Sequence, residues 1–325
     1  RDRVETAWPP ATSGVRNPYK GLAAFGEADA MDFFGRDELV TDVVDRVVGS
    51  AIRPALVALV GPSGSGKSSL VGAGLIPAVR QDGIERGRTV AIAEVAPRSA
   101  PFAELRTALE RAVPDLPGDI LAELGADQRG LLRVSEHLRG DDTDLVLVVD
   151  QLEELFTLTS DEEVRRLFLS NLATAAGAQP GNLRIVVAMR SDSLHEVSHH
   201  RIFMELMQQA LVEVTIPGDA GLAEAIGEPA RRVGLELEPG LVPTMLRDLA
   251  GEPSALPIMQ HTLTELAEAA RGGAVTLAEY ERLGGVAATT VACAEAVFTQ
   301  LSPSGKAAAR ELFLSLVAVD GEGQR

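Results

Sequence analysis

Gly61-Pro62-Ser63-Gly64-Ser65-Gly66-Lys67-Ser68 is the stretch of this sequence that decides the fold. It fits the pattern G-x-x-x-x-G-K-[ST], in which a glycine-rich loop wraps its backbone amides around phosphate oxygens. An apolar run of strand length at residues 56–60 precedes it, and residues 69–75 can continue as a helix. The sequence therefore predicts a phosphate-binding loop between a buried strand and the N-terminus of a helix.

Each residue type in this loop has a chemical use. Gly61, Gly64 and Gly66 let the backbone turn tightly and approach an anion closely. Lys67 adds a positive charge that reaches the outer phosphates, and the Ser68 hydroxyl is a suitable ligand for Mg²⁺. The residues that we expect to bind a nucleotide here are Gly61, Ser63, Gly64, Ser65, Gly66, Lys67, Ser68 and Ser69.

The composition limits the kinds of protein that the chain can be. With 325 residues, of which 46% are hydrophobic, it has room for two or three globular domains. No apolar run reaches the length of a membrane span, so we expect no membrane insertion. The single cysteine, Cys293, excludes an internal disulfide and fits the reducing cytoplasm, where we expect the protein to reside.

The formal net charge of −17 bears on the choice of partner. A field of this sign repels phosphate backbones, so we expect no direct binding of nucleic acid by this chain. The chain begins with Arg1 rather than Met, and residues 1–20 are rich in Pro, Thr and Arg. We therefore expect a fragment of a longer protein, with residues 1–20 as a linker from an upstream domain.

Apolar runs of strand length alternate with helical patterns through the first part of the chain. The expected strands are residues 56–60, 89–95, 144–149, 182–190 and 211–216. The helices expected between them are residues 37–48, 100–113 and 119–139. This alternation favours an α/β fold, in which helices cover both faces of a parallel five-stranded sheet.

A carboxylate, Asp150, ends the apolar run that begins at residue 144. Such a run is typical of a strand buried on both faces, and its carboxyl end faces the crevice where α/β sheets bind ligands. Asp150 can hold Mg²⁺ there, either through a water molecule or together with Ser68. Either Glu153 or Glu154 can orient or deprotonate the attacking water, although acidic residues are also common at a solvated helix start.

Arg190 ends the expected strand at residues 182–190. An arginine at the crevice end of a strand beside the Mg²⁺ strand can sense the γ-phosphate of a bound nucleotide. The alternative is a surface arginine without a role in catalysis. Together, Lys67, Arg190 and one of the two glutamates are the candidate catalytic residues.

From about Asp219 onward the pattern is helical only. The expected helices are residues 220–233, 239–250, 256–271, 277–283, 287–301 and 304–319. We therefore expect a nucleotide-binding domain at 21–217, an all-helical domain at 218–286, and the truncated start of a further domain at 287–325.

A second motif points to different chemistry. His195-Glu196-Val197-Ser198-His199 matches H-E-x-x-H, which on a helix places two histidines on one face for Zn²⁺, with Glu196 as general base. At the metzincin spacing for a third ligand, Glu205 stands in place of histidine. Glu224 is a downstream carboxylate, but it belongs to the expected helical domain. A zinc metalloprotease is therefore an alternative that lacks its third ligand.

Nine segments of the sequence together resemble one family. They are Asn17-Pro18-Tyr19-Lys20-Gly21-Leu22, Phe33-Phe34-Gly35-Arg36, Gly61 to Ser69, Ala73-Gly74-Leu75-Ile76-Pro77, Val148 to Phe156, Met189-Arg190-Ser191-Asp192, Ile226-Gly227-Glu228-Pro229-Ala230, Ala255 to His261, and Tyr280 with Gly284-Gly285-Val286. The chain resembles the STAND ATPases (signal transduction ATPases with numerous domains), and in particular their bacterial "novel STAND" branch. The resemblance covers about residues 17–323.

The resemblance implies roles for individual residues. Phe34, Gly35 and Arg36 look like the element that packs on the adenine, and Arg190 looks like the sensor arginine. Pro257 looks like the proline of a helical lid that closes over the nucleotide. Residues from about 287 look like the start of a winged-helix domain. In one place the chain departs from the family, because Ser193-Leu194-His195 stands where an aromatic residue usually follows the Arg-x-Asp turn.

The resemblance also implies a function. STAND proteins are similar to NB-ARC and NACHT proteins, which are switches that are closed with ADP and open, often oligomeric, with ATP. The implied activity is slow hydrolysis of Mg-ATP that controls an effector, as in transcription regulation or defence. The effector and a ligand sensor are expected in fused domains outside this fragment. The alternative within the same fold is an AAA+-like ATPase that remodels a partner by fast turnover.

Overall fold

The computed structural model describes residues 16–49, 55–139, 143–178, 182–270 and 273–316. The chain divides into two compact units. The first unit contains residues 23–232, and the second combines the residues up to Leu22 with those from Val233 onward. The domain boundaries expected at residues 20, 217 and 286 stay a prediction.

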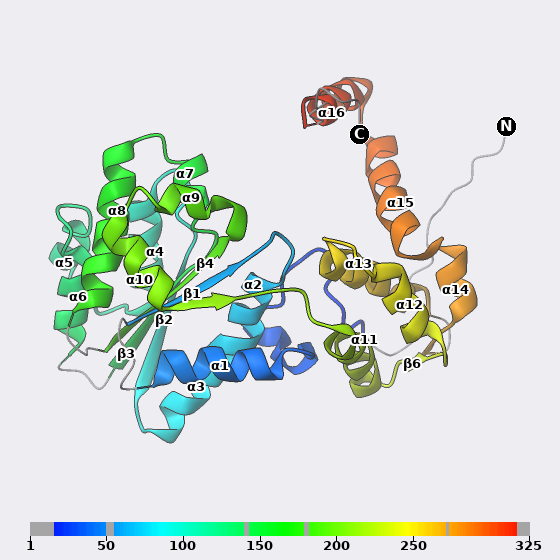
Figure 1. The fold of residues 1–325 in the computed structure, drawn as a ribbon, viewed down its shortest axis with the longest axis horizontal. Helices are drawn as coiled ribbons and strands as arrows, with labels where there is room; N and C mark the ends of the chain where they lie inside the picture. The colour runs from blue at the N-terminus through cyan, green and yellow to red at the C-terminus, as the bar shows by residue number, and fades with distance from the viewer. Residues whose placement is uncertain (1–15, 50–54, 140–142, 179–181, 271–272, 317–325) are drawn as a thin grey trace. The chain divides into compact units, whose positions relative to one another are not determined.

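A five-stranded parallel sheet forms the centre of the first unit (Figure 1). Its strands are β1 (Leu56–Gly61), β2 (Thr89–Val95), β3 (Thr143–Val149), β4 (Leu183–Arg190) and β5 (Leu211–Glu213). Their order is β2-β3-β4-β1-β5, and all neighbours are parallel. The residues that follow β1, β3 and β4 therefore meet at one edge of the sheet. This confirms the predicted α/β class with its parallel sheet.

Helices and turns of the first unit surround this sheet. They are η1 (Glu27–Asp32), α1 (Asp37–Val48), α2 (Lys67–Ser69), the π-helical turn η2 (Leu70–Leu75), α3 (Ile76–Glu85), α4 (Pro101–Ala112), α5 (Gly118–Ala122), α6 (Gly130–Leu138), α7 (Glu154–Thr157), α8 (Glu162–Gly177), η3 (Ser191–Ser193), α9 (Leu194–Val197), α10 (Arg201–Gln209) and α11 (Asp219–Val233). Among the helices in the described ranges, none has the length and apolar character that a membrane span needs.

Two apolar cores lie on the two faces of the sheet, because successive residues of a strand point to opposite sides. On β1, Leu56, Ala58 and Val60 join one core, whereas Val57 and Leu59 join the other. The first core is covered by α4, α6, α8 and α10, and the second by α1, η2 and α3 (Figure 1). The central strands are buried on both faces, which is why they read as continuous apolar runs in the sequence.

The helix expected at residues 119–139 is in fact two, α5 and α6, so that prediction was wrong in its continuity. Gly130 explains the break, because a Cβ atom there would lie 2.2 Å from the Leu124 carbonyl oxygen. Asn171 of α8 supports the turn: its side chain accepts from Leu131 N at 3.1 Å and donates to Asp127 O at 2.8 Å. This support comes from a distant helix, so local periodicity does not reveal it.

The second unit contains the remaining elements, and its helices lie close to the predicted ranges. The elements are β6 (Glu236–Leu237), α12 (Leu241–Leu249), α13 (Ala255–Ala269), β7 (Ala274–Val275), α14 (Leu277–Arg282), α15 (Gly285–Gln300) and α16 (Pro303–Leu316). The short parallel pair β6–β7 was not predicted, since two residues per strand are too few to show alternation. The segment before the sheet unit also belongs here: Asn17 Nδ2 donates to Thr264 O at 3.1 Å, and Lys20 N donates to Gln260 Oε1 at 3.2 Å.

Candidate functional site

The glycine-rich loop lies between β1 and α2, at the carboxyl edge of the sheet. Gly64 has a φ angle of 75° and Gly66 one of 86°, a left-handed conformation that other residues seldom adopt. These two residues curl the loop so that successive backbone N–H groups can line a concave surface for an anion. Lys67 and Ser68 then begin the helix, both half-buried, whereas Ser63 is exposed at the tip.

Gly61, the first glycine of the motif, is required for a different reason. Its φ is not left-handed, but a Cβ atom there would lie 2.1 Å from Val214 O and 2.8 Å from Ser65 Oγ. Val214 follows β5, and its N–H donates to Val60 O at 2.7 Å. At the point where the loop leaves β1, its backbone is therefore in close contact with the segment that follows β5, and only glycine fits there.

Lys67 is the centre of a group of charged side chains. Its Nζ donates to the carbonyl oxygens of Gly61 and Pro62, both at 2.9 Å. Burial lowers the pKa of Lys67, while the negative charges of Glu153 and Asp150 oppose that shift. The positive charge of Arg190 also lowers this pKa. The structure thus gathers the predicted residues that follow β1, β3 and β4 around one ammonium group.

A strained turn after β3 positions the acidic residues. Gln151 has a φ angle of 53°, which is uncommon for a residue with a side chain. Asp150 Oδ1 accepts from Gln151 N at 2.9 Å, and Leu152 N donates to Ala188 O on β4 at 3.0 Å. The turn therefore directs the chain across the edge of β4, toward the strand that carries the phosphate loop.

The two candidate glutamates have different surroundings. Glu153 Oε2 accepts a hydrogen bond from Arg190 N at 3.2 Å, and its charge acts on Lys67. Glu154 begins α7, and its buried Oε2 has no hydrogen-bond partner among the described residues. Glu153 is thus the glutamate that lies with Lys67 and the end of β4.

Arg190 is exposed and pairs with Asp192, its Nε donating to Asp192 Oδ1 at 3.1 Å. This hydrogen bond holds the pKa of Asp192 below its usual range. The negative charge of Asp192 also reaches Lys67, where it raises the pKa. Asp192 was not among the site residues predicted from sequence. Its signals in the sequence were its place two residues after the strand-terminal arginine and its part in the family segment Met189-Arg190-Ser191-Asp192.

The Phe34-Gly35-Arg36 segment lies between the loop and α11. Gly35 has a φ angle of 80°, and a Cβ atom there would lie 2.1 Å from Gly221 O. Phe34 is half-buried, whereas Arg36 is buried with 9% exposure. Arg36 Nη2 donates to Ser65 O, inside the glycine-rich loop, at 2.6 Å. The fold therefore brings this segment to the loop from 29 residues away in sequence.

Two other predicted binding residues have distinct positions. The Ser69 hydroxyl accepts a hydrogen bond from Phe25 N at 3.1 Å, which ties the chain before η1 to the start of the helix. Pro257 lies in α13 of the second unit, and its expected part in binding stays a prediction.

Glu94 is a further acidic residue at this edge that sequence patterns did not reveal. It is paired in register with Val148, near the end of β2. Burial raises the pKa of Glu94, and the negative charges of Glu27 and Asp150 raise it further. In the sequence it is one polar residue in an alternating strand, which is the ordinary pattern for solvent exposure.

The H-E-x-x-H motif does not form the arrangement that zinc needs. Helix α9 ends at Val197, so His195 and His199 do not share a continuous helix. His195 Nδ1 lies 2.9 Å from Asp192 O, and its Nε2 lies 3.3 Å from Glu196 Oε1. Within the described ranges, no group of three or more potential ligands of the His, Cys, Asp and Glu types is close enough to hold a metal.

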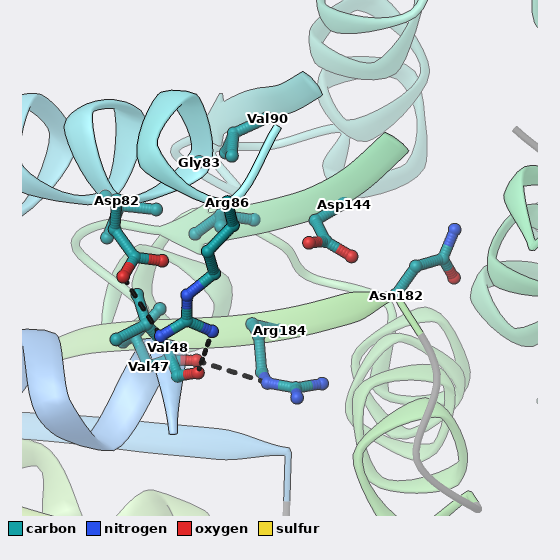
Figure 2. A pocket seen from close by; sticks show the side chains of 11 residues that line it. Val47, Val48, Asp82, Gly83, Arg86, Val90, Asp144, Asn182 and Arg184 are labelled. Carbon is teal, nitrogen blue, oxygen red and sulfur yellow. Dashed lines mark hydrogen bonds and ion pairs between the residues drawn. The ribbon is translucent and has the colours of Figure 1, made fainter. Parts of the chain in front are cut away.

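A separate pocket of about 170 Å³ lies at the opposite edge of the sheet, where β2, β3 and β4 begin (Figure 2). Arg86 Nη1 donates to Val48 O at 3.1 Å, and Arg184 Nε donates to Val47 O at 3.2 Å. Figure 2 shows both guanidinium groups turned to the end of α1. They therefore satisfy the last carbonyl groups of that helix, which is a structural role.

The donors and acceptors at the loop edge suit a magnesium nucleotide. Mg²⁺ usually takes one or two protein ligands and completes its shell with phosphate oxygens and water. Ser68 and Asp150 would be those ligands, and the loop amides with Lys67 would bind the phosphates.

The family model described as Novel STAND NTPase 1 matches residues 18–325 and confirms the resemblance seen in the motifs. No curated protein matches the sequence.

Several solved structures have a similar fold. The Aeropyrum pernix ORC1 protein in complex with DNA has 15% identity and a TM-score of 0.58, over 83% of this chain and 69% of that chain. The A. pernix ORC2 protein, in ADPNP–ADP complexes, has 15% identity and a TM-score of 0.51, over 78% of this chain and 64% of that one. Drosophila ORC bound to DNA has 16% identity and a TM-score of 0.50, over 93% and 73%. At these identities the similarity shows the fold alone.

Proposed function

Since the chain belongs to the novel STAND NTPase family, we propose that it is an ATP-dependent molecular switch that controls an effector domain outside residues 1–325. The observation that carries the proposal is the group of charges around Lys67, to which Asp150, Glu153 and Arg190 contribute from the ends of neighbouring strands. Such a group can bind a triphosphate, position water and respond to the γ-phosphate, which are the tasks of a nucleotide switch.

Each residue has a proposed task. Lys67 and the loop amides hold the β- and γ-phosphates. Ser68 and Asp150 would hold Mg²⁺, which would supply positive charge to offset the charge of the phosphates. Glu153 accepts a proton from the attacking water, whose oxygen forms a bond to the γ-phosphorus as the bond to the bridging oxygen breaks. Arg190 leaves Asp192 to stabilise charge on the γ-phosphate; inorganic phosphate is then released, and ADP stays bound.

The proposed general base can be tested directly. We expect Glu153→Gln to lower ATP turnover by about 10²- to 10⁴-fold, the usual contribution of a general base, while ATP affinity stays close to that of the wild type. Glu154→Gln is the matched control, because it changes the adjacent carboxylate in the same way. Similar losses in both variants, or a larger loss in Glu154→Gln, would contradict the role of Glu153.

Nucleotide binding itself is tested with Lys67→Ala. Lys67 supplies a charged donor at a half-buried position, so we expect ADP binding to fall below detection in calorimetry. Lys306→Ala in α16 removes the same charge elsewhere and is expected to leave the affinity unchanged. Unchanged ADP affinity in Lys67→Ala would refute the proposed site.

A switch differs from a remodelling ATPase in its turnover. The AAA+-like alternative has some support, because the ORC1 and ORC2 proteins share this fold. We expect slow hydrolysis with retained ADP, measured by single-turnover and steady-state assays of the same preparation. Fast turnover stimulated by a partner would favour the alternative.

The partners proposed for the switch follow from the same reasoning. We expect Glu153→Gln to self-associate with ATP and not with ADP, as measured by light scattering. Although the solved ORC1 structure contains DNA, the net charge of −17 leads us to expect no binding of duplex DNA by this chain at low salt. A cytoplasmic location and a part in bacterial transcription regulation or defence complete the proposal.

A further inference from the structure

Arg36 is a buried cation whose guanidinium is directed into the phosphate loop. Its Nη2 donates to Ser65 O at 2.6 Å, a short distance for a bond between a charged donor and a neutral acceptor. The side chain is only 9% exposed, and burial lowers the pKa of Arg36 to about 10. Burying a charge is costly, so this arginine would be a poor choice at a site where it had no task.

The peptide bond that Arg36 contacts needs an anchor. Ser65 lies between Gly64 and Gly66, whose φ angles of 75° and 86° are open to many other backbone conformations. The Ser65–Gly66 peptide unit can therefore rotate more easily than a unit between residues with side chains. The Ser65 hydroxyl does not hold it, since this buried oxygen has no hydrogen-bond partner among the described residues.

Fixing the carbonyl group fixes the amide that follows it. A peptide unit is planar and trans, so its C=O and N–H bonds point in opposite directions. When Arg36 holds Ser65 O on its own side, Gly66 N–H must point away from Arg36. Gly66 N–H is one of the loop amides beside Lys67, at the start of the helix where phosphate oxygens bind.

The direction of Arg36 is itself fixed by the fold. Gly35 packs against Gly221 so closely that a Cβ atom would lie 2.1 Å from Gly221 O. Immediately after Arg36, α1 begins at Asp37. The backbone from which the Arg36 side chain projects is thus fixed on both sides.

We propose that Arg36 is a positioning residue that orients the Gly66 amide of the phosphate loop, and that it acts on the phosphates rather than on the base. This inference rests on the proposed nucleotide-binding function. It also gives Arg36 a different task from the adenine contact that the family resemblance implies, which is left to Phe34 and Gly35.

The two roles differ in the part of the ligand that they affect. If Arg36 acts through the loop, Arg36→Ala weakens the binding of ADP and of inorganic pyrophosphate by the same factor. We expect that factor to be about 10- to 100-fold, the size of one charge-assisted hydrogen bond. If Arg36 contacts the adenine, ADP affinity falls and pyrophosphate affinity stays the same.

The test is to measure the affinity of a small set of variants for ADP and for inorganic pyrophosphate by calorimetric titration. Arg36→Lys keeps the charge and one donor, and we expect it to recover part of the affinity for both ligands. Arg46→Ala removes an exposed arginine from α1, the helix that begins immediately after Arg36, and controls for the loss of charge. If Arg36→Ala does not fold, as judged by circular dichroism, Arg36→Lys and Arg36→Gln carry the comparison.

The outcomes are separable. Equal loss for both ligands, with partial recovery in Arg36→Lys, supports the positioning role. Loss for ADP alone, or no loss for either ligand, overturns it while the nucleotide site itself stands. A wild-type protein that binds neither ligand overturns the proposed function together with this inference.

Discussion

Gly61→Ala tests whether the first glycine of the loop is required by close packing. Most substitutions in such a loop combine a steric effect with a change of backbone conformation. Gly61 separates the two, because its φ is not left-handed and alanine could adopt it freely. The obstacle is the Val214 carbonyl oxygen, which would lie 2.1 Å from the new Cβ atom.

The structure sets the size of the effect. A carbon and a carbonyl oxygen rarely come closer than about 3.3 Å, so the backbone segments at positions 61 and 214 must separate by more than about 1 Å. Overpacking of this kind costs about 1–3 kcal/mol. The neighbouring hydrogen bond from Val214 N to Val60 O, at 2.7 Å, would be strained or lost, which adds about 1 kcal/mol. We therefore expect the free energy of unfolding to fall by about 2–4 kcal/mol.

Urea unfolding followed by circular dichroism measures this difference, and ADP titration of the same protein measures the effect on the loop. Gly227→Ala is the matched control, because no atom lies within 4 Å of its Cβ position in α11. In that helix, alanine is expected to be equal to glycine or about 0.5–1 kcal/mol more stable. If Gly61→Ala unfolds within about 0.5 kcal/mol of the control, the steric explanation is refuted.

Three other measurements address the charges of the site. Burial lowers the pKa of Lys67 in the folded protein. Just below the ordinary lysine pKa of about 10.4, the unfolded chain therefore binds more protons than the folded one. The free energy of unfolding should then rise with pH in that window. Lys67→Met should remove this rise in urea unfolding at stepped pH, and an unchanged pH profile would argue against the buried ammonium. Asp192→Asn frees Arg190 from an exposed ion pair, so ATP affinity should increase by no more than about fivefold in calorimetry; a decrease would mean that Asp192 itself supports binding. His199→Ala should retain wild-type ATP turnover, and elemental analysis of the wild type should find no stoichiometric zinc; either a lost activity or bound zinc would revive the metalloprotease alternative.

The sequence predicts the sheet well because its central strands are buried on both faces. Residues 144–149 and 182–190 are almost uninterrupted apolar runs, and the structure has strands within one residue of these bounds. All neighbouring strands are parallel, so Asp150 and Arg190 lie at the same edge of the sheet as the loop that carries Lys67. Local composition was therefore sufficient for the fold class, whereas the roles of the site residues stay a prediction.

What the sequence could not provide are the contacts that depend on backbone direction and on distant segments. Glu153 and Glu154 are equivalent in a helix-start pattern, and the left-handed φ of Gln151 separates them by turning the chain across β4. Arg36 and Ser65 are 29 residues apart in the sequence, and their contact lies next to a second long-range contact, between Gly35 and Gly221. Neither contact can be predicted from hydrophobic periodicity or from motif spacing.

The net charge of the chain is negative, whereas the phosphate loop offers Lys67 and amide donors to an anion. Which of the two acts on a ligand depends on distance. At physiological ionic strength, the field of exposed charges is screened beyond about 8 Å, whereas the loop amides and Lys67 act at hydrogen-bond distance in a partly buried site. A nucleotide needs only that one place. A nucleic-acid backbone must lie along an extended surface, where we expect the net charge of −17 to oppose binding. We therefore expect the acidic composition to disfavour nucleic acid while leaving a nucleotide free to bind at the loop.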